Sequence, residues 1–323
     1  MTRVLVLGAG GFVGRHLVAA LAATGDLVPV ALVRGAPPVL PAGVALRQAD
    51  ATDAEALGRA LAGVEAAVNC VAGPGATMEA VTRNLLAAAP RHGLRRIVHL
   101  SSMAVYGEAA GRVDEDHRVD GTASRYAAAK VACEGLVRAA PGIETVILRP
   151  GCIHGPDGRQ WTERLGRLLA QRRIGDLGEN GDGICNLTFI DDMTRAVAAA
   201  LRRPDAAGGV FNVSDPDPAT WNRYLVALGR AIGAVPVARV PGLRQAAEVK
   251  LLAPPLALAE RLAGRLPLGV RTPACVTPAM ARLWRQEITL DHRRADAGLA
   301  FARTPPAEAL AAAARWLRGA LAA

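Results

Sequence analysis

Short apolar runs alternate with helix-like segments along the first half of the chain. The strand-like runs span residues 3–8, 27–34, 44–50, 65–72, 95–102 and 144–150, and the helix-like segments span 12–24, 53–62, 78–92 and 124–140. Short buried strands separated by helices are typical of a parallel sheet that is covered on both faces. The pattern therefore predicts an α/β fold with a Rossmann-type, doubly wound parallel sheet, in which ligands lie at the carboxyl ends of the strands.

The regular alternation weakens after Pro150. Loops rich in Gly and Asp, a strand-like run at 209–215 and an Ala-, Pro- and Arg-rich region at 236–285 predict a smaller, discontinuous C-terminal substrate-binding module. The predicted dinucleotide-binding domain comprises residues 1–155 and 186–215, and the predicted substrate-binding module with the C-terminal helices comprises 156–185 and 216–323. The stretch 253–268 is broken by prolines, which favours a lid or packing helix over a membrane-surface helix.

Composition narrows the class of protein. The 323 residues are 51% hydrophobic, yet no uninterrupted apolar run reaches membrane-spanning length. The chain opens directly into a strand-like run without a signal-type segment. Both observations predict a cytoplasmic protein without a membrane partner. The net charge of +9 comes from arginines spread along the chain, and only 3% of residues are aromatic, which argues against a nucleic-acid partner. The five cysteines show no metal-like spacing, so no metal site is predicted.

The sequence GAGGFVG at residues 8–14 follows the first strand-like run directly. Gly8 allows a tight turn, Gly11 lets backbone amides approach a pyrophosphate, and Gly14 allows close packing of the following helix. This motif between a strand and a helix predicts dinucleotide binding. Asp50, after the run at 44–50, is placed to accept a hydrogen bond from the adenine amino group, whereas the role of helix cap suits Thr52 or Asp53 better.

The end of the second strand-like run bears on the choice of cofactor. It reads ALVRG, with Arg34 and no nearby carboxylate that could hold a ribose diol. A guanidinium there suits a 2′-phosphate, so NADP is the preferred cofactor and NAD remains the alternative.

A second motif joins Ser102 with Tyr126 and Lys130. The chain contains only two lysines, Lys130 and Lys250, and Lys130 follows Tyr126 by one helical turn. Tyrosine ordinarily titrates near 10, so its use as an acid or base at neutral pH requires a positive charge nearby. A compact ammonium can supply that charge and hold ribose hydroxyls at the same time. Ser102 ends the run at 95–102, where its hydroxyl would face the cofactor cleft.

Together the motifs GAGGFVG, VNCVAG, SSMAVYG, YAAAK and LRPGCIHGP resemble the extended short-chain dehydrogenase/reductases of the NAD(P)-dependent epimerase/dehydratase family. The resemblance covers about residues 3–215 and is faint beyond 236. It implies that Ser102, Tyr126 and Lys130 are catalytic. It also implies homodimers formed through the helices at about 78–92 and 124–140. The cofactor-binding residues that it implies are Gly8, Gly11, Phe12, Val13, Gly14, Arg34, Asp50, Ala51, Ala72, Tyr126, Lys130 and Pro150.

The chain also departs from the family pattern. Family dehydratases carry an Asp-Glu pair after the catalytic hydroxyl residue, whereas Met103 and Ala104 follow Ser102 here, which argues against 4,6-dehydration. His154 replaces the tyrosine of the usual IYGP ending. Met103, His154 and Arg159 are candidate substrate contacts, with loop packing for His154 and a solvated charge for Arg159 equally open.

These observations predict an NAD(P)-dependent oxidoreductase with a small-molecule substrate. Hydride transfer to a ketone, or from a secondary alcohol, would use Tyr126 as general acid or base on a sugar nucleotide or a molecule of similar size. The first alternative is a nucleotide-sugar 4-epimerase with retained NAD. The second is a non-catalytic dinucleotide sensor, against which the intact Ser102, Tyr126 and Lys130 argue.

Overall fold

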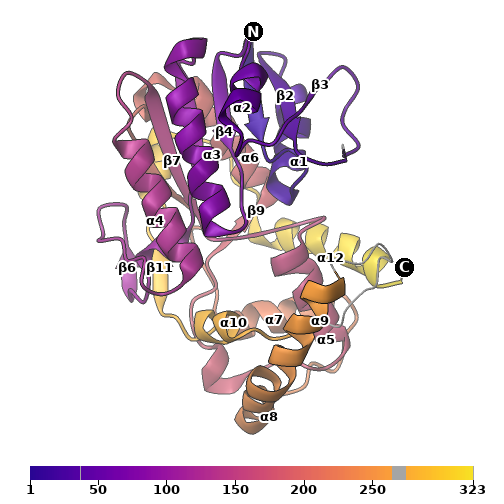
Figure 1. The fold of residues 1–323 in the computed structure, drawn as a ribbon. Coiled ribbons are helices and arrows are strands. Elements are labelled where there is room, and N and C mark those ends of the chain that lie inside the picture. Colours follow the sequence, from indigo (N-terminus) through magenta and orange to yellow (C-terminus); the bar gives the residue numbers. More distant parts are fainter. Residues whose placement is uncertain (37, 264–273, 323) are drawn as a thin grey trace.

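The computed structural model describes residues 1–36, 38–263 and 274–322. Among these residues, seven strands form one parallel sheet in the order β10-β7-β5-β4-β1-β2-β3 (Figure 1). The strands are β1 (Thr2–Leu7), β2 (Leu27–Val33), β3 (Ala45–Gln48), β4 (Ala66–Asn69), β5 (Arg96–Leu100), β7 (Glu144–Pro150) and β10 (Val210–Val213). The chain runs from β1 outward to β3 and then crosses to β4 on the other side of β1. The order in which strands are added to the sheet therefore reverses between β1 and β4, and ligands of such sheets bind at this point. The predicted doubly wound α/β fold is confirmed.

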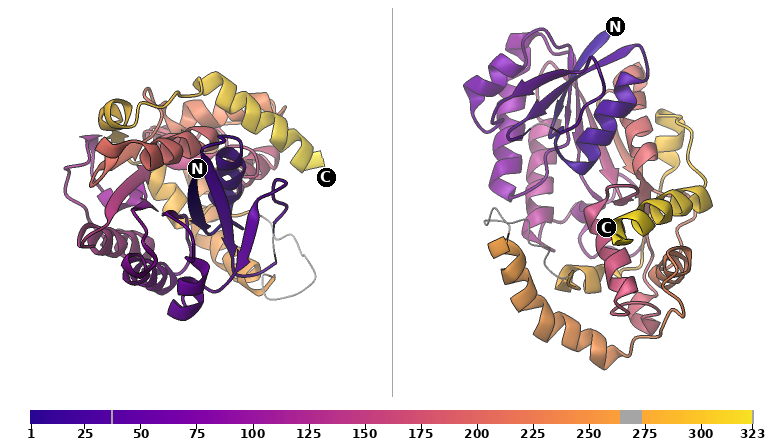
Figure 2. Two further views of the ribbon diagram at one scale, coloured as in Figure 1. Left: turned by 90° about the horizontal axis from the view of Figure 1, so that it is seen from above. Right: turned by 90° about the vertical axis from the view of Figure 1, so that its right-hand side faces the viewer.

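Helices cover both faces of this sheet (Figures 1 and 2). The helices α1 (Phe12–Ala22) and α6 (Ile190–Arg202) pack on one face, and α2 (Ala54–Ala60), α3 (Gly75–Ala88) and α4 (Arg125–Arg138) cover the other. The alternation of side chains along β1 explains this, since Val4 and Val6 join the core under α1 and α6 while Leu5 and Leu7 join the core under α2 and α3. All four side chains are fully buried, as expected for a central parallel strand.

The smaller module lies against the carboxyl edge of the sheet and has a core of its own (Figure 2). That core joins Leu165, Trp221, Leu228, Met280 and Leu317. The helices of this part are α5 (Arg164–Ala170), α7 (Trp221–Ala231), α8 (Gly242–Ala247), α9 (Ala253–Ala263), α10 (Pro278–Leu283), α11 (Arg293–Gly298) and α12 (Pro306–Ala322). Helix α11 is the exception, because its Ala295 packs into the core of the large sheet.

Two short strand pairs connect segments that are distant in the sequence. Strand β8 (Cys152–His154) pairs in parallel with β9 (Leu187–Phe189), and β6 (Gly111–Val113) pairs in parallel with β11 (Ile288–Leu290). The second pair ties a loop that follows Ser102 to the C-terminal part of the chain.

Several predictions concern segments that the structure describes only in part. The expected lid or packing helix at 253–268 corresponds to α9 as far as Ala263, and its remainder lies outside the described residues. Helices α3 and α4 correspond to the segments at 78–92 and 124–140, and the homodimer through them stays a prediction. No helix in the described part of the chain is long and apolar enough to cross a membrane.

Candidate active site

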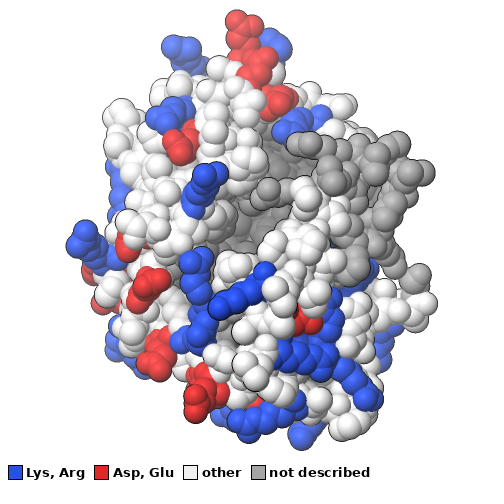
Figure 3. Space-filling view, turned by 60° about the horizontal axis from the view of Figure 1, so that its bottom comes forward, with Lys and Arg blue, Asp and Glu red and all other residues white. Residues whose placement is uncertain are grey.

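A cleft of about 1340 Å³ opens where β1, β4, β5 and β7 end. Its lining includes residues that directly follow these strands, namely Gly8, Cys70, Ser101 and Gly151. The opposite wall comes from residues 277–287, which include α10. Figure 3 shows a hollow in the surface that is bordered by basic side chains. The cleft therefore lies where the topology of the sheet predicts a ligand.

The glycine motif lines one end of the cleft. Gly8 has a φ of +80°, and a Cβ there would lie 3.2 Å from the Cys70 carbonyl carbon. A Cβ on Gly14 would lie 2.2 Å from the Gly8 carbonyl oxygen, so α1 can approach β1 only with glycine at this position. Gly11 is the N-cap of α1 and offers no side-chain cap, which leaves the amides of the first turn free for an anion. The turn therefore fits the pyrophosphate of a dinucleotide, as predicted.

Other residues predicted around the cofactor divide into two groups. Phe12, Val13, Ala72 and Pro150 line the cleft. Arg34, Asp50 and Ala51 lie outside its lining, where β2 and β3 end. They remain candidates for the adenosine end of the cofactor.

Asp50 and Arg34 lie near each other and interact electrostatically. The Asp50 carboxylate accepts hydrogen bonds from the amide and hydroxyl of Thr52, at 2.9 and 2.8 Å, and these bonds, aided by Arg34, lower its pKa. The exposed Arg34 guanidinium makes no hydrogen bond or salt bridge with any described residue. Asp53 is the N-cap of α2, which confirms one of the two expected caps.

The structure brings Ser102 and Tyr126 to the same cleft. Ser102 ends the segment after β5 and caps the short 3₁₀ helix η2 (Met103–Tyr106), with its hydroxyl accepting from the Ala104 amide at 3.2 Å. Tyr126 opens α4 after the Ser124 N-cap and is 40% exposed. Burial of the phenol group raises the pKa of Tyr126, and the adjacent Ser102 hydroxyl partly offsets this effect. Tyr126 is therefore a protonated phenol at neutral pH.

Lys130 lies one turn further along α4 and is only 3% exposed. Its ammonium lies 5.8 Å from the centre of the Tyr126 ring and donates one hydrogen bond to the Leu100 carbonyl, at 2.7 Å. Burial lowers the pKa of Lys130 to about 8, although the Cys133 and Cys70 thiols and Glu134 act in the opposite direction. Two of its three donors have no partner among the described residues, which leaves them available to ribose hydroxyls.

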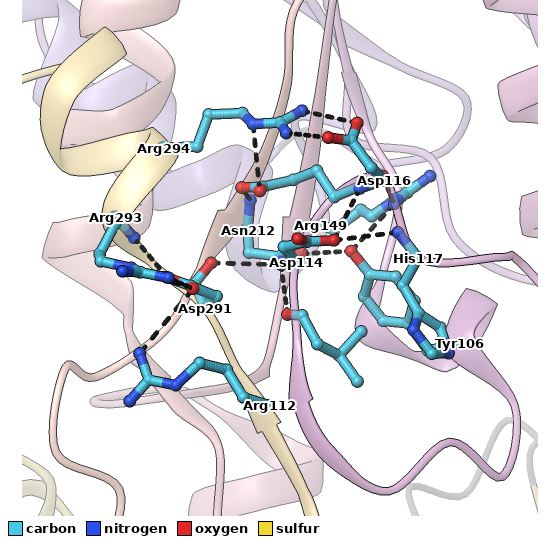
Figure 4. Close-up of polar contacts among 12 residues, drawn as sticks. Tyr106, Arg112, Asp114, Asp116, His117, Arg149, Asn212, Asp291, Arg293 and Arg294 are labelled. Atoms are coloured by element: carbon cyan, nitrogen blue, oxygen red, sulfur yellow. Dashed lines mark hydrogen bonds and ion pairs between the residues drawn. The ribbon is translucent and has the colours of Figure 1, made fainter.

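A buried ion pair fixes α4 to the sheet. Arg149 on β7 donates to both carboxylate oxygens of Glu134 on α4, at 2.9 and 2.6 Å. Its remaining nitrogen donates to the Tyr106 hydroxyl and the Glu115 carbonyl oxygen, at 2.9 and 3.0 Å. The close-up in Figure 4 shows how Tyr106 in turn reaches Asn212 on β10. This network holds the helix that carries Tyr126 and Lys130.

The three candidate substrate contacts have different positions. Met103 lines the cleft, as predicted. The structure does not bring His154 or Arg159 to the cleft lining. Side chains alternate along β8, so Ile153 faces the cleft while His154 packs against Phe189 and Tyr224 on the other side. Arg159 is exposed at the start of the π-turn η3 (Arg159–Glu163).

Sequence reasoning missed much of the cleft wall. Trp161, Met280 and Leu283 form apolar parts of it, and Arg282 and Arg285 add two exposed guanidinium groups. No motif distinguishes these residues, and they come from segments without regular patterning. Their positions depend on the tertiary packing of α10 and η3 against the sheet edge.

Comparison with known proteins agrees with this geometry. The sequence profile of the NAD dependent epimerase/dehydratase family matches residues 4–214. The 2-alkyl-3-oxoalkanoate reductase of Stenotrophomonas maltophilia (strain K279a) is 30% identical over 287 residues, which cover 82% of this chain and 86% of that protein.

Solved structures share the fold along the whole chain. A short-chain dehydrogenase/reductase superfamily protein from Agrobacterium tumefaciens with bound NAD is 25% identical and superposes with a TM-score of 0.71, covering 99% of this chain and 98% of its own. UDP-glucuronic acid 4-epimerase from Bacillus cereus, in complex with UDP-glucuronic acid and NAD, is 20% identical with a TM-score of 0.74, over 99% of this chain and 100% of its own. This chain is accordingly an enzyme of the NAD-dependent epimerase/dehydratase family, of the short-chain dehydrogenase/reductase type.

Proposed function

We propose that this chain is an NADP-linked ketone reductase, or an alcohol dehydrogenase in the reverse direction. The observation that carries the proposal is the shared cleft, in which Ser102 and Tyr126 lie between the glycine turn and the apolar wall while Lys130 is buried beneath Tyr126. The nicotinamide cofactor, when bound, donates or accepts the hydride. The protein's own side chains carry out the proton transfer and orient the substrate.

Tyr126 is suited to give a proton to a carbonyl oxygen. Because burial raises the pKa of Tyr126, the phenol is protonated before the reaction, which favours the role of general acid and hence the reductive direction. The Lys130 ammonium, 5.8 Å from the ring centre, stabilises the phenolate that remains after proton transfer. The Ser102 hydroxyl donates a hydrogen bond to the same substrate oxygen and orients it.

The preference for NADP rests on Arg34. Its guanidinium is exposed at the end of β2 and makes no hydrogen bond or salt bridge with a described residue, so it can bind a 2′-phosphate without giving up another bond. Asp50 is held by Thr52 and is not aligned against Arg34 as an ion pair. NAD stays the alternative cofactor.

The cleft wall favours a substrate with an apolar body and an anionic group. Met103, Trp161, Met280 and Leu283 give apolar contact, whereas the guanidinium group of Arg282 has no hydrogen bond or salt bridge with a described residue. A 3-oxo acid combines both properties, and the reductase from Stenotrophomonas maltophilia is named for such a compound. A sugar nucleotide, which carries a diphosphate, is the alternative substrate.

The proposal is tested with purified enzyme, NADPH and a panel of 3-oxo acids, followed by the loss of NADPH absorbance. Tyr126→Phe should lower turnover by about 10²–10⁴-fold, because general acid catalysis contributes that much, while NADPH affinity stays unchanged. Near-normal turnover in Tyr126→Phe would remove Tyr126 as the proton donor. NAD that stays bound through turnover, together with inversion of a nucleotide sugar, would instead identify a 4-epimerase.

The substrate class is tested separately with Arg282→Gln. This variant should raise KM for a 3-oxo acid by about tenfold, since a charge-assisted hydrogen bond contributes roughly 1.5–3 kcal/mol. The KM for the matching uncharged methyl ketone should not change. An equal effect on both ketones would show that Arg282 does not bind the carboxylate.

A further inference from the structure

A second cavity, here called the His154 cavity, lies apart from the active-site cleft. Its volume is about 250 Å³, and it is lined by residues of β8, β9, α7, the loop after β10 and the first turn of α12. It shares no lining residue with the cleft, since Cys152 and Ile153 line the cleft and His154 lines the cavity. Pockets for drug-sized ligands measure roughly 300–1,000 Å³, so this cavity suits a smaller molecule.

The lining of the cavity includes buried polar atoms that lack a hydrogen-bond partner among the described residues. His154 is 2% exposed, and neither of its ring nitrogens has a hydrogen-bond partner among the described residues. Tyr224 is 7% exposed, and its buried hydroxyl also lacks a partner in the described part of the chain. The two rings meet edge to face, with centroids 6.0 Å apart. Buried polar groups in native proteins are nearly always hydrogen-bonded, so these two side chains point to a bound molecule.

The charges around the cavity favour a positive ligand. Asp215 and Asp217 contribute two carboxylates, and Arg223 is the one basic residue of the lining within the described chain. The Asp215 carboxylate accepts no hydrogen bond from a described side chain. Burial and the nearby Asp192 raise the pKa of Asp215 to about 6, while Arg303 acts in the opposite direction. This carboxylate is therefore partly desolvated without a cation of its own.

Arg303 is not free to serve as that cation. Its guanidinium donates to Asp296 at 2.5 Å and to the Ser214 carbonyl oxygen at 2.7 Å. The Arg303 guanidinium therefore acts on the Asp215 carboxylate only through its charge and does not pair with it. A metal ion is also a poor candidate, because no group of three or more His, Cys, Asp or Glu side chains in the described residues could hold one.

We infer that the His154 cavity binds a small organic ammonium ion, with the charged group on Asp215 and with His154 and Tyr224 as its further contacts. Burial lowers the pKa of His154 to about 4, so the ring is neutral and one nitrogen can accept a hydrogen bond from the ammonium. The Tyr224 oxygen is a second acceptor, and the face of its ring attracts a cation. The carboxylates of Asp215 and Asp217 would instead repel an anion.

The inference is tested by calorimetric titration of the full chain with propylammonium chloride, with 1-propanol as a neutral probe of the same shape and propionate as an anionic probe. Propylammonium should bind saturably and both other probes should bind at least tenfold more weakly. Asp215→Asn should weaken propylammonium at least tenfold, and Tyr224→Phe should weaken it several-fold. Asp205→Asn is the matched control, because this exposed carboxylate lies outside the cavity lining, and it should change nothing.

The dependence on pH gives an independent test. The charged and titratable groups that interact with Asp215 are Asp192, Arg303, Cys185 and Tyr224, and the same cavity is also lined by Asp217, Arg223 and His154. Burial raises the pKa of both Cys185 and Tyr224 well above neutrality and lowers the pKa of His154 to about 4, so among the groups with a shifted pKa only Asp215 changes charge between pH 5 and 7. Affinity for propylammonium should therefore rise about tenfold over this range and stay flat in Asp215→Asn. Absence of saturable binding, equal binding by the Asn variant, or tighter binding of propionate or 1-propanol would each overturn the inference.

Discussion

The ion pair between Glu134 and Arg149 should be one of the most sensitive positions in the protein. Glu134 is 2% exposed and Arg149 is 1% exposed, so Glu134→Gln would leave a guanidinium buried beside a neutral amide. Removal of one partner from a buried ion pair costs about 3–5 kcal/mol in the free energy of unfolding. The bonds that Arg149 keeps with Tyr106 and Glu115 place the expected loss at the lower end of this range, about 3 kcal/mol.

Urea titration followed by circular dichroism measures this loss. The matched control is Glu55→Gln, because Glu55 pairs with Arg59 across 3.8 Å on the exposed surface of α2, and such pairs contribute about 0–1 kcal/mol. The double variant Glu134→Gln/Arg149→Met should recover part of the loss, since it removes the unpaired charge. If Glu134→Gln destabilised no more than Glu55→Gln, the idea that this pair anchors α4 would be wrong.

The same pair predicts how stability depends on pH. Burial raises the pKa of Glu134, but the hydrogen bonds and charge of Arg149 outweigh that effect, so the pKa ends below its usual value. A carboxyl with a lowered pKa stabilises the folded state above its unfolded pKa and loses this contribution as pH falls. The difference in stability between the wild type and Glu134→Gln should therefore shrink in acid.

Three further changes test the cofactor site. Gly14→Ala should abolish NADPH binding or folding, because the added Cβ would lie 2.2 Å from a backbone oxygen of the turn, and calorimetry together with a melting curve separates the two results. Burial lowers the pKa of Lys130 to about 8, so NADPH affinity should fall as pH rises from 7 to 9. The variant Lys130→Met should bind NADPH weakly, with an affinity that does not depend on pH in this range. If the affinity of Lys130→Met still depended on pH, another group would be responsible for the titration. Arg34→Asp should weaken NADPH at least tenfold more than NADH, because a carboxylate would face the 2′-phosphate, and equal losses would end the preference for NADP.

Local sequence patterns predicted the sheet domain well. The buried apolar run of β1, the glycine spacing and the four-residue step from Tyr126 to Lys130 are all short-range features, and the structure contains each of them. Such features can be predicted from the sequence because the periods of strands and helices follow from backbone geometry alone.

The substrate half of the cleft could not be predicted in this way. Arg282 and Arg285 reach the cleft only because α10 packs against the sheet edge, more than a hundred residues after Tyr126 in the chain. His154 shows the same limit on a smaller scale. Its place in the motif that usually ends in IYGP made it a candidate substrate contact, but the alternation of side chains along β8 directs it to the second cavity.

We propose above that a nicotinamide cofactor binds exchangeably in the cleft above Lys130. Calorimetric titration of the purified chain with NADPH and NADH, after a check for retained cofactor, measures this binding. We expect reversible binding at one site, tighter for NADPH than for NADH, and weakened binding in Lys130→Met. Absence of binding by either cofactor, or unchanged binding in Lys130→Met, would show that the cofactor does not bind in this way.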